Sequence, residues 1–303
     1  MSKLKYYMLT ILLRAASLLN LSTAQHVGGF LGDITWRLRT RSRKATDVNL
    51  AYCLPNLSDG ERKQLSYDSM RHTGMTALEI PLMWEWPVHK CLSLITDVEG
   101  IELIDDALAS GKGLILLAPH LGNWELVGLY FSSRYKMATL YSPPNMKEFE
   151  EYMINVRSRL GAELVRGDRR GLIRLMSILK EGGIAGILPD QSPRGKTSAF
   201  APFFGTDVKT MTLAAKLLQK TGANALITYT ERLPGAQGFK LVIDKVGDEI
   251  ASPDPVVAAT VLNQSIEKMI LRAPEQYQWE YKRLRHRRAG QPNPYDPSKF
   301  CRG

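Results

Sequence analysis

The middle of the chain alternates short apolar runs with helical stretches, and this alternation most limits the possible folds. The clearest run, 113–118 (Gly-Leu-Ile-Leu-Leu-Ala), follows a glycine-rich breaker and has the length of a buried strand. Further strands are expected at 137–141, 184–188, 225–231 and 239–246, and helices at 124–130, 148–160, 171–179 and 211–221. Strands separated by helices of about ten residues predict an α/β fold, with a mostly parallel central sheet flanked by helices.

The segments on either side of this region are predicted to be helical. Helices are expected over 59–72 and 75–86, with Pro81 marking a kink or break inside the second, and over 256–271. Because no internal repeat divides the 303 residues, we expect one large domain over 31–290. Residues 1–30 precede it as an N-terminal extension, and residues 291–303 are expected to form a loose tail.

The N-terminal extension has the character of a membrane anchor. Lys3 and Lys5 precede the apolar run 6–13, Arg14 interrupts it, and 15–21 continues the apolar character. An arginine near the centre of a span costs about 2.5–3.5 kcal/mol, which makes a membrane span marginal. We therefore expect an anchor that either spans the membrane as a short helix or lies in its interface. The basic residues over 37–44 would keep the body on the cytoplasmic side. An ordinary buried helix and a signal peptide are the alternatives.

Charge and cysteine content narrow the class of protein. The formal charge of +10 predicts an anionic partner, such as phospholipid headgroups, nucleic acid or an acidic carrier protein. The three cysteines have no CxxC spacing, and their odd number favours a reducing compartment. Since the five histidines do not cluster with these cysteines, we expect no metal and no cofactor.

The candidate catalytic base is His120, directly after the strand at 113–118. Folds with parallel sheets build their active sites at the carboxyl ends of strands. Glu125 lies five positions on, and five residues of continuous helix would turn it away from His120. We therefore expect a sharp turn at Gly122, with Asn123 as helix N-cap, to bring Glu125 back to the imidazole. Chance spacing of two structural residues is the alternative.

A histidine held by a carboxylate is a general base, and this one has no nucleophilic side chain beside it. The chain has no G-x-S-x-G elbow, and the H-x4-E spacing does not match a helical zinc motif. The proton would therefore come from the acceptor, which predicts acyl transfer to a hydroxyl. Activation of water by the same base would make a thioesterase or esterase instead.

Several motifs of the chain form a set: His-Leu-Gly-Asn-Trp-Glu at 120–125, Leu-Pro-Asp-Gln at 188–191, Pro-Phe-Phe-Gly at 202–205 and Pro-Glu-Gln-Tyr-Gln-Trp at 274–279. Together they resemble the bacterial lipid A biosynthesis lauroyl/myristoyl acyltransferase family of the glycerolipid acyltransferase superfamily. The resemblance implies that 31–290 is a catalytic domain. It also implies transfer of a fatty acyl chain from acyl carrier protein to a hydroxyl of a lipid A precursor, at the cytoplasmic face of the bacterial inner membrane.

The resemblance also implies substrate-binding residues around the base. Arg157, Arg159 and Arg166 are the candidates to stabilise the oxyanion, without a ranking among them. Asp190 would hold one of these arginines or a sugar hydroxyl, and Gln191 would shape the pocket floor together with the Phe-Phe-Gly run at 203–205. The basic segment 192–199 would touch acceptor phosphates or be a solvated loop.

Alternatives to transfer onto lipid A remain open. Other polar lipids, such as phosphatidylinositol mannosides, are alternative acceptors within the same superfamily. Besides transfer and hydrolysis, a third class of function is a non-enzymatic module that binds anionic lipid or nucleic acid through its basic runs. The chain has no nucleic-acid recognition motif, so we expect no nucleic-acid partner. Acyl-chain length and the acceptor's identity do not follow from the sequence.

Overall fold

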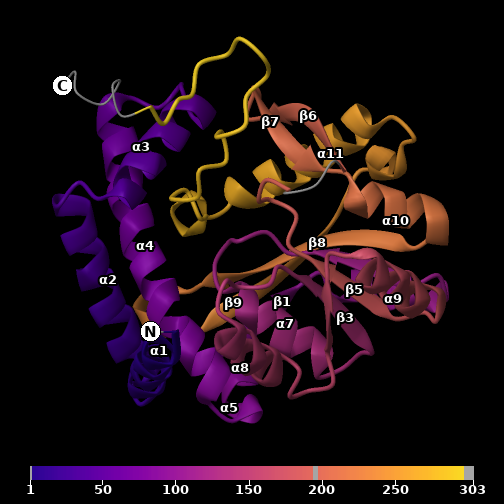
Figure 1. Cartoon of the computed structure of the whole chain (residues 1–303), viewed down its shortest axis with the longest axis horizontal. Helices are drawn as coiled ribbons and strands as arrows, with labels where there is room; N and C mark the ends of the chain where they lie inside the picture. The colour runs from indigo at the N-terminus through magenta and orange to yellow at the C-terminus, as the bar shows by residue number, and fades with distance from the viewer. Residues whose placement is uncertain (1, 194–196, 297–303) are drawn as a thin grey trace.

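The computed structural model describes residues 2–193 and 197–296, and its centre is a seven-stranded sheet (Figure 1). The strand order is β1-β9-β8-β2-β5-β3-β4, and only the β8–β9 pairing is antiparallel. The strands are β1 (Ile95–Glu99), β2 (Leu114–Leu117), β3 (Met137–Tyr141), β4 (Glu163–Arg166), β5 (Ile184–Ile187), β8 (Asn224–Arg232) and β9 (Phe239–Lys245). The predicted α/β class with a mostly parallel sheet is confirmed.

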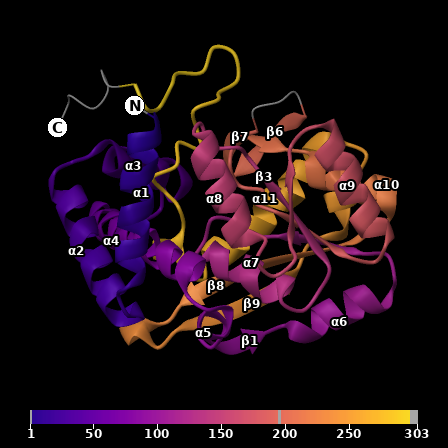
Figure 2. The same ribbon diagram turned by 60° about the horizontal axis from the view of Figure 1, so that its bottom comes forward.

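Helices cover both faces of the sheet, so the central strands are buried on both sides (Figures 1 and 2). One face packs on α6 (Ile101–Ala109) and α7 (Trp124–Ser132), through side chains such as Leu114 and Leu116 of β2. The other packs on α9 (Arg169–Lys180), α10 (Leu213–Thr221) and α11 (Pro255–Ile270), through Ile115 and Leu117. Burial on both faces explains why these strands appear in the sequence as continuous apolar runs.

Several elements were not predicted. These include the edge strands β1 and β4 and the helix α6. The two strands have partly polar sequences, because one side of an edge strand is exposed. A separate antiparallel hairpin joins β6 (Ser198–Phe203) to β7 (Thr206–Met211). Its two-residue turn places Phe204 and Gly205 at positive φ, which matches the twist of the paired strands. The last two residues of the predicted loop 192–199 therefore belong to β6, and its residues 194–196 lie outside the described residues.

Four helices form the N-terminal part of the chain: α1 (Ser2–Ser17), α2 (Leu21–Arg37), α3 (Arg41–Cys53) and α4 (Asp59–Glu85). The two helices predicted over 59–86 are one continuous helix, which includes Pro81. Gly74 does not break it, because the glycine serves a close helix crossing instead. A Cβ at Gly74 would lie 2.1 Å from the carbonyl oxygen of Gly28 in α2. Glycine at this position lets the two backbones touch.

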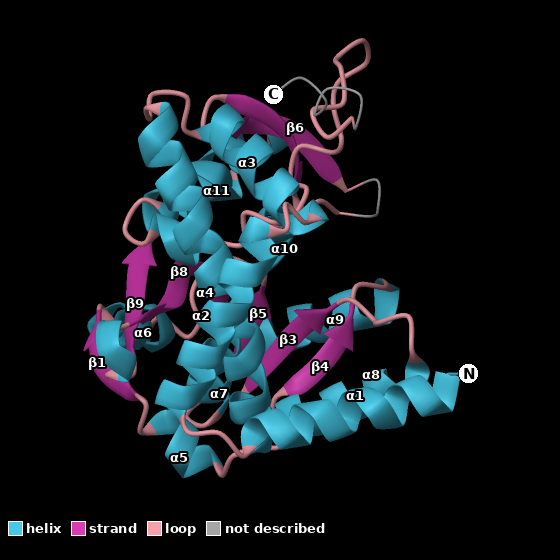
Figure 3. Ribbon diagram, turned by 90° about the vertical axis from the view of Figure 1, so that its left-hand side faces the viewer, coloured by secondary structure: helices cyan, strands magenta, loops and turns pink. Residues whose placement is uncertain are grey.

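The first two helices expose apolar side chains, and Figure 3 shows α1 along one side of the molecule. The exposed side chains are Leu4, Tyr7, Met8, Ile11 and Leu12 on α1, and Val27, Phe30, Leu31 and Ile34 on α2. Within residues 2–193 and 197–296, no helix has the length and apolar character needed to cross a membrane. The predicted N-terminal anchor therefore stays a prediction. Short α5 (Val88–Leu92) follows α4.

The described part of the predicted loose tail is not wholly loose. Tyr295 is buried, and its hydroxyl accepts a hydrogen bond from the backbone N–H of Leu284 at 2.9 Å and donates one to Asn49 Oδ1 at 2.5 Å. These contacts fasten the chain near its end against α3. Residues 297–303 of the predicted tail lie outside the described residues.

Candidate active site

Two neighbouring strands end at the same edge of the sheet and carry the site's central pair. β2 and β5 are parallel, and Leu117 pairs with Ile187 at their carboxyl ends. His120 follows Leu117 by three residues, and Asp190 follows Ile187 by three. Because the strands are in register, these two polar residues come together beyond the sheet edge.

Asp190 is the carboxylate that holds His120. The ring nitrogen Nδ1 lies 2.8 Å from Asp190 Oδ1, and the backbone N–H of His120 donates to Asp190 Oδ2 at 3.0 Å. An ionised carboxylate only accepts hydrogen bonds, so Nδ1 carries the proton and Nε2 is free to accept one. Burial opposes the charge on Asp190, but the charge and the hydrogen bonds of His120 outweigh it and lower the pKa of Asp190.

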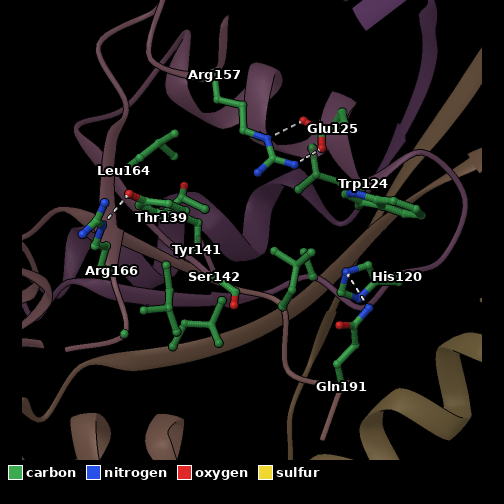
Figure 4. A pocket seen from close by; sticks show the side chains of 18 of the residues that line it. His120, Trp124, Glu125, Thr139, Tyr141, Ser142, Arg157, Leu164, Arg166 and Gln191 are labelled. Carbon is green, nitrogen blue, oxygen red and sulfur yellow. Dashed lines mark hydrogen bonds and ion pairs between the residues drawn. The ribbon is translucent and has the colours of Figure 1, made fainter. Parts of the chain in front are cut away.

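The predicted hydrogen bond between His120 and Glu125 is wrong. Asn123 does cap α7, accepting from the N–H of Leu126 at 3.3 Å, and Gly122 does take the positive φ that the turn requires. However, α7 begins at Trp124, and the first turn directs Glu125 away from the imidazole. Trp124 occupies the position beside the ring, with 5.0 Å between the ring centroids (Figure 4).

Glu125 instead forms a buried ion pair with Arg157, at the end of α8 (Lys147–Arg157). Arg157 donates from Nε to Glu125 Oε2 at 2.9 Å and from Nη2 to Oε1, and the indole N–H of Trp84 donates to Oε2 at 3.0 Å. Burial alone would raise the pKa of Glu125, but the charge and hydrogen bonds of Arg157 lower it. Glu125 therefore orients Arg157 and does not hold the imidazole.

The other two predicted arginines differ in their surroundings. Arg159 donates to the backbone oxygens of Met83, Trp84 and Trp86, and so satisfies the carbonyl end of α4. Arg166 donates to Glu150 Oε1 at 2.7 Å and leaves about half of its side chain (54%) exposed. Arg159 is a structural residue, whereas Arg166 is accessible to a substrate.

A cavity of about 880 Å³ brings most of the predicted site residues together (Figure 4). His120, Glu125, Arg157, Arg166 and Gln191 line it, and Arg159 and Asp190 do not. Most of the remaining wall is apolar, with side chains such as Leu116, Val127, Leu129, Met137, Leu140 and Met153. The cavity therefore joins a histidine base and two arginines to a space suited to an apolar chain.

Gln191 contacts the free ring nitrogen of His120. Its amide nitrogen lies 3.3 Å from His120 Nε2 and 2.9 Å from Gln278 Oε1. A hydroxyl that replaced this amide at Nε2 would be placed for proton removal. The Phe-Phe-Gly run, which we expected at the pocket floor, does not line the cavity; Phe203 is buried in the core and packs on Phe204.

A buried polar network supports the turn that carries His120. Thr230 of β8 accepts from the backbone N–H of Asn123 and donates from its hydroxyl to the carbonyl of Asn123 at 2.6 Å. The Asn123 side chain donates to Glu79 Oε2 at 3.2 Å, and Glu79 is fully buried in an ion pair with Arg232. The catalytic turn is thus held by α4 and β8 at once.

Sequence reasoning missed two residues of the site and the partner of a third. Asp190 was selected, but for another partner; the repeated pattern of Pro119-His120 and Pro189-Asp190 after two apolar strands would have indicated the pairing. Trp84, whose indole N–H donates to Glu125, was not selected as a site residue. Arg285 also lines the cavity and was not selected; its side chain donates a hydrogen bond to the hydroxyl of Tyr281, at 3.1 Å.

The side chains that line the cavity include groups suited to acid–base chemistry and to binding an anion. Among residues 2–193 and 197–296, no group of three or more His, Cys, Asp or Glu side chains is placed to hold a metal ion. What the arrangement offers is a histidine whose Nδ1 is held by Asp190, arginines that line the same cavity and an apolar space.

Comparison with known proteins identifies the family. The model of the bacterial lipid A biosynthesis acyltransferase family matches residues 1–286 of this chain. The chain belongs to this family. It is therefore an acyltransferase, and the resemblance drawn from its motifs is confirmed.

Individual relatives agree over most of the acyltransferase's length. Escherichia coli lipid A biosynthesis palmitoleoyltransferase is 30% identical over 270 residues, 89% of this chain and 87% of the relative. Escherichia coli lipid A biosynthesis lauroyltransferase is 27% identical over 272 residues, with the same coverage. A phosphatidylinositol mannoside acyltransferase of Mycobacterium tuberculosis is 27% identical over 136 residues, 44% of this chain and 43% of the relative.

Proposed function

We propose that this acyltransferase moves a fatty acyl chain from the thioester of acyl carrier protein to a hydroxyl of a lipid A precursor. The observation that carries the proposal is the placement of His120 Nε2 in an apolar-lined cavity, with Nδ1 held by the buried Asp190. Lipid A relatives that match over most of the chain support the acceptor. The net charge of +10 supports an acidic donor protein.

In the proposed mechanism, His120 Nε2 takes the proton of the acceptor hydroxyl as its oxygen attacks the thioester carbonyl. Asp190 stabilises the imidazolium that forms. The carbonyl oxygen becomes negative, and Arg157, which lines the same cavity and is held by Glu125, stabilises it. The tetrahedral intermediate then breaks its C–S bond, and the imidazolium returns the proton to the leaving thiolate. The products are an ester and a thiol.

The remaining predicted residues bind rather than react. In the absence of substrate, the amide of Gln191 contacts His120 Nε2, and it moves aside when the acceptor hydroxyl binds. Arg166 is available for the donor or the acceptor because half of its side chain is exposed. Arg285 is available for an acceptor phosphate, since its described hydrogen bond is to a hydroxyl and not to a carboxylate.

The exposed apolar faces of α1 and α2 support a position at the inner membrane, on its cytoplasmic side. Exposed apolar side chains alternate there with Lys3, Lys5 and Arg14, which suits an anionic lipid surface. Deletion of residues 1–30 should release the protein from membranes in cell fractionation. Complete retention of the truncated protein on membranes would contradict this role.

The test of the function is transfer by purified protein from acyl carrier protein thioester to a lipid A precursor, followed by mass spectrometry. We expect an acylated lipid with the wild type and none with His120→Ala, whose fold is checked by circular dichroism. Release of free fatty acid without acylated lipid would assign a hydrolase instead. Acylation of a phosphatidylinositol mannoside alone would favour the acceptor named by the partial relative. Full activity of His120→Ala would exclude this base.

A further inference from the structure

Resting on the proposed function, we propose that Gly128, Gly186 and Met137 set the length of acyl chain that the cavity admits. All three line the cavity that contains His120, and they lie on α7, β5 and β3. Two of them lack a side chain where the wall would otherwise project inward. The third has a flexible tip that fills part of the space thus left.

Gly128 is a glycine that the backbone does not require. It lies inside α7 without a positive φ, and a Cβ built on it would meet no heavy atom within 4 Å. The contrast is Gly74, where a Cβ would lie 2.1 Å from a backbone oxygen. Glycine inside a helix is destabilising relative to alanine. Since no packing constraint explains this cost, the empty space in the cavity is what the glycine provides.

The position of Gly128 relative to the base suits the path of an acyl chain. Trp124 contacts the His120 ring, and Gly128 lies one helical turn further along α7, about 6 Å on the same face. A chain whose carbonyl is at His120 and that runs between α7 and the sheet therefore passes Gly128. A side chain at this position would narrow that path.

The opposite wall is the sheet, and its register shows how far the cavity extends inward. Ala118 and Leu116 line it, and Gly186 pairs with Leu116, about 7 Å inward from Ala118 at 3.3 Å per residue. Thr139 of β3 pairs with Gly186, and Met137 lies two residues further in. The cavity thus follows the strands away from the His120 edge.

Met137 closes this inner part. Its Cε lies 2.5 Å from where a Cβ on Gly186 would be, so the tip of Met137 occupies the place of the missing side chain. Methionine is unbranched and flexible, and its side chain adapts its shape to the space it fills. The inner limit of the cavity is therefore one side chain lying over one glycine.

The experiment measures kcat/KM of the full-length protein with acyl carrier protein thioesters from octanoyl to palmitoyl. Gly128→Leu should lower the value for the longest accepted donor about tenfold relative to the shortest, because each buried methylene contributes a few-fold. Met137→Ala should shift the preference towards longer chains. Gly128→Ala, which adds one methyl group in open space, should give a smaller shift of the same sign and serves if Gly128→Leu does not fold.

Gly60→Leu is the matched control. Gly60 is also helical, in α4, and a Cβ there meets no heavy atom within 4 Å, but it is solvent-exposed and outside the cavity. It should leave the chain-length profile unchanged. An unchanged profile in folded, active Gly128 and Met137 variants would overturn the inference while the proposed function stands. Absence of transfer by the wild type with every donor would instead overturn the proposed function, and the inference with it.

Discussion

Replacing Asp190 with asparagine tests whether Asp190, and not Glu125, is the carboxylate that supports His120. Asp190 accepts hydrogen bonds from both Nδ1 and the backbone N–H of His120, at 2.8 and 3.0 Å, in a fully buried position. Asparagine keeps the size but loses the charge that stabilises the protonated ring. Hydrogen bonds to charged groups contribute about 1.5–3 kcal/mol, so we expect a loss of about 3 kcal/mol in transition-state stabilisation. This corresponds to about a 100-fold lower kcat/KM.

The assay pairs transfer kinetics with nitrogen NMR of the labelled histidine rings. In the wild type, His120 should be the tautomer with a proton on Nδ1 and an unprotonated Nε2, because Asp190 accepts at Nδ1. Asp190→Asn should lower kcat and alter this tautomer. The matched control, Glu125→Gln, should weaken the Arg157 pair and lower activity with the tautomer unchanged.

Two results would refute this reasoning. One is an Asp190→Asn enzyme whose kcat/KM stays within about threefold of the wild type, since a charge-assisted bond to the base cannot be removed so cheaply. The other is a change of the His120 tautomer in Glu125→Gln, which would mean that the motif glutamate reaches the ring after all.

Two predictions concern stability. Burial and the charge of Arg232 lower the pKa of His72 from its usual 6.5 to about 3. Because the unfolded chain binds the proton more readily than the folded one, the free energy of unfolding has its full value above pH 6.5 and falls by about 2 kcal/mol by pH 5. Urea titrations should show this loss and show it reduced in His72→Asn; equal slopes would contradict it. Gly74→Ala should lower the free energy of unfolding by about 1–3 kcal/mol, because the new Cβ overlaps Gly28. The control Gly60→Ala, at an exposed helical position, should not destabilise the protein. Equal melting temperatures for Gly74→Ala and the wild type would exclude the close helix crossing.

The central strands could be predicted from the sequence because burial on both faces leaves a clear pattern. β2, β3 and β5 lie within one residue of their predicted ranges. The edge strands β1 and β4 could not, since a strand covered on one side carries polar residues and resembles a loop. The helices predicted over 59–72 and 75–86 are one helix; the gap between them contains Gly74, and a glycine that allows two helices to touch looks, in sequence, like one that ends a helix.

The site shows the same division between local and distant contacts. The turn at Gly122 and the cap at Asn123 were predicted because both depend on neighbouring residues only. The partner of His120 was not, because five residues of separation determine closeness along the chain but not the direction of a side chain. Asp190 lies 70 positions away and reaches the ring through the pairing of β2 with β5.

The sequence by itself determined the class of fold and the family and singled out His120 as the candidate base, since these depend on apolar patterning and on motifs that are local in the chain. Only the tertiary structure decided which carboxylate holds His120, which arginine Glu125 orients and which glycines leave the cavity open. Those contacts join segments that are distant in sequence, and their geometry depends on strand register and on the point where α7 begins. Such distances are a property of the packed chain, so no spacing rule supplies them.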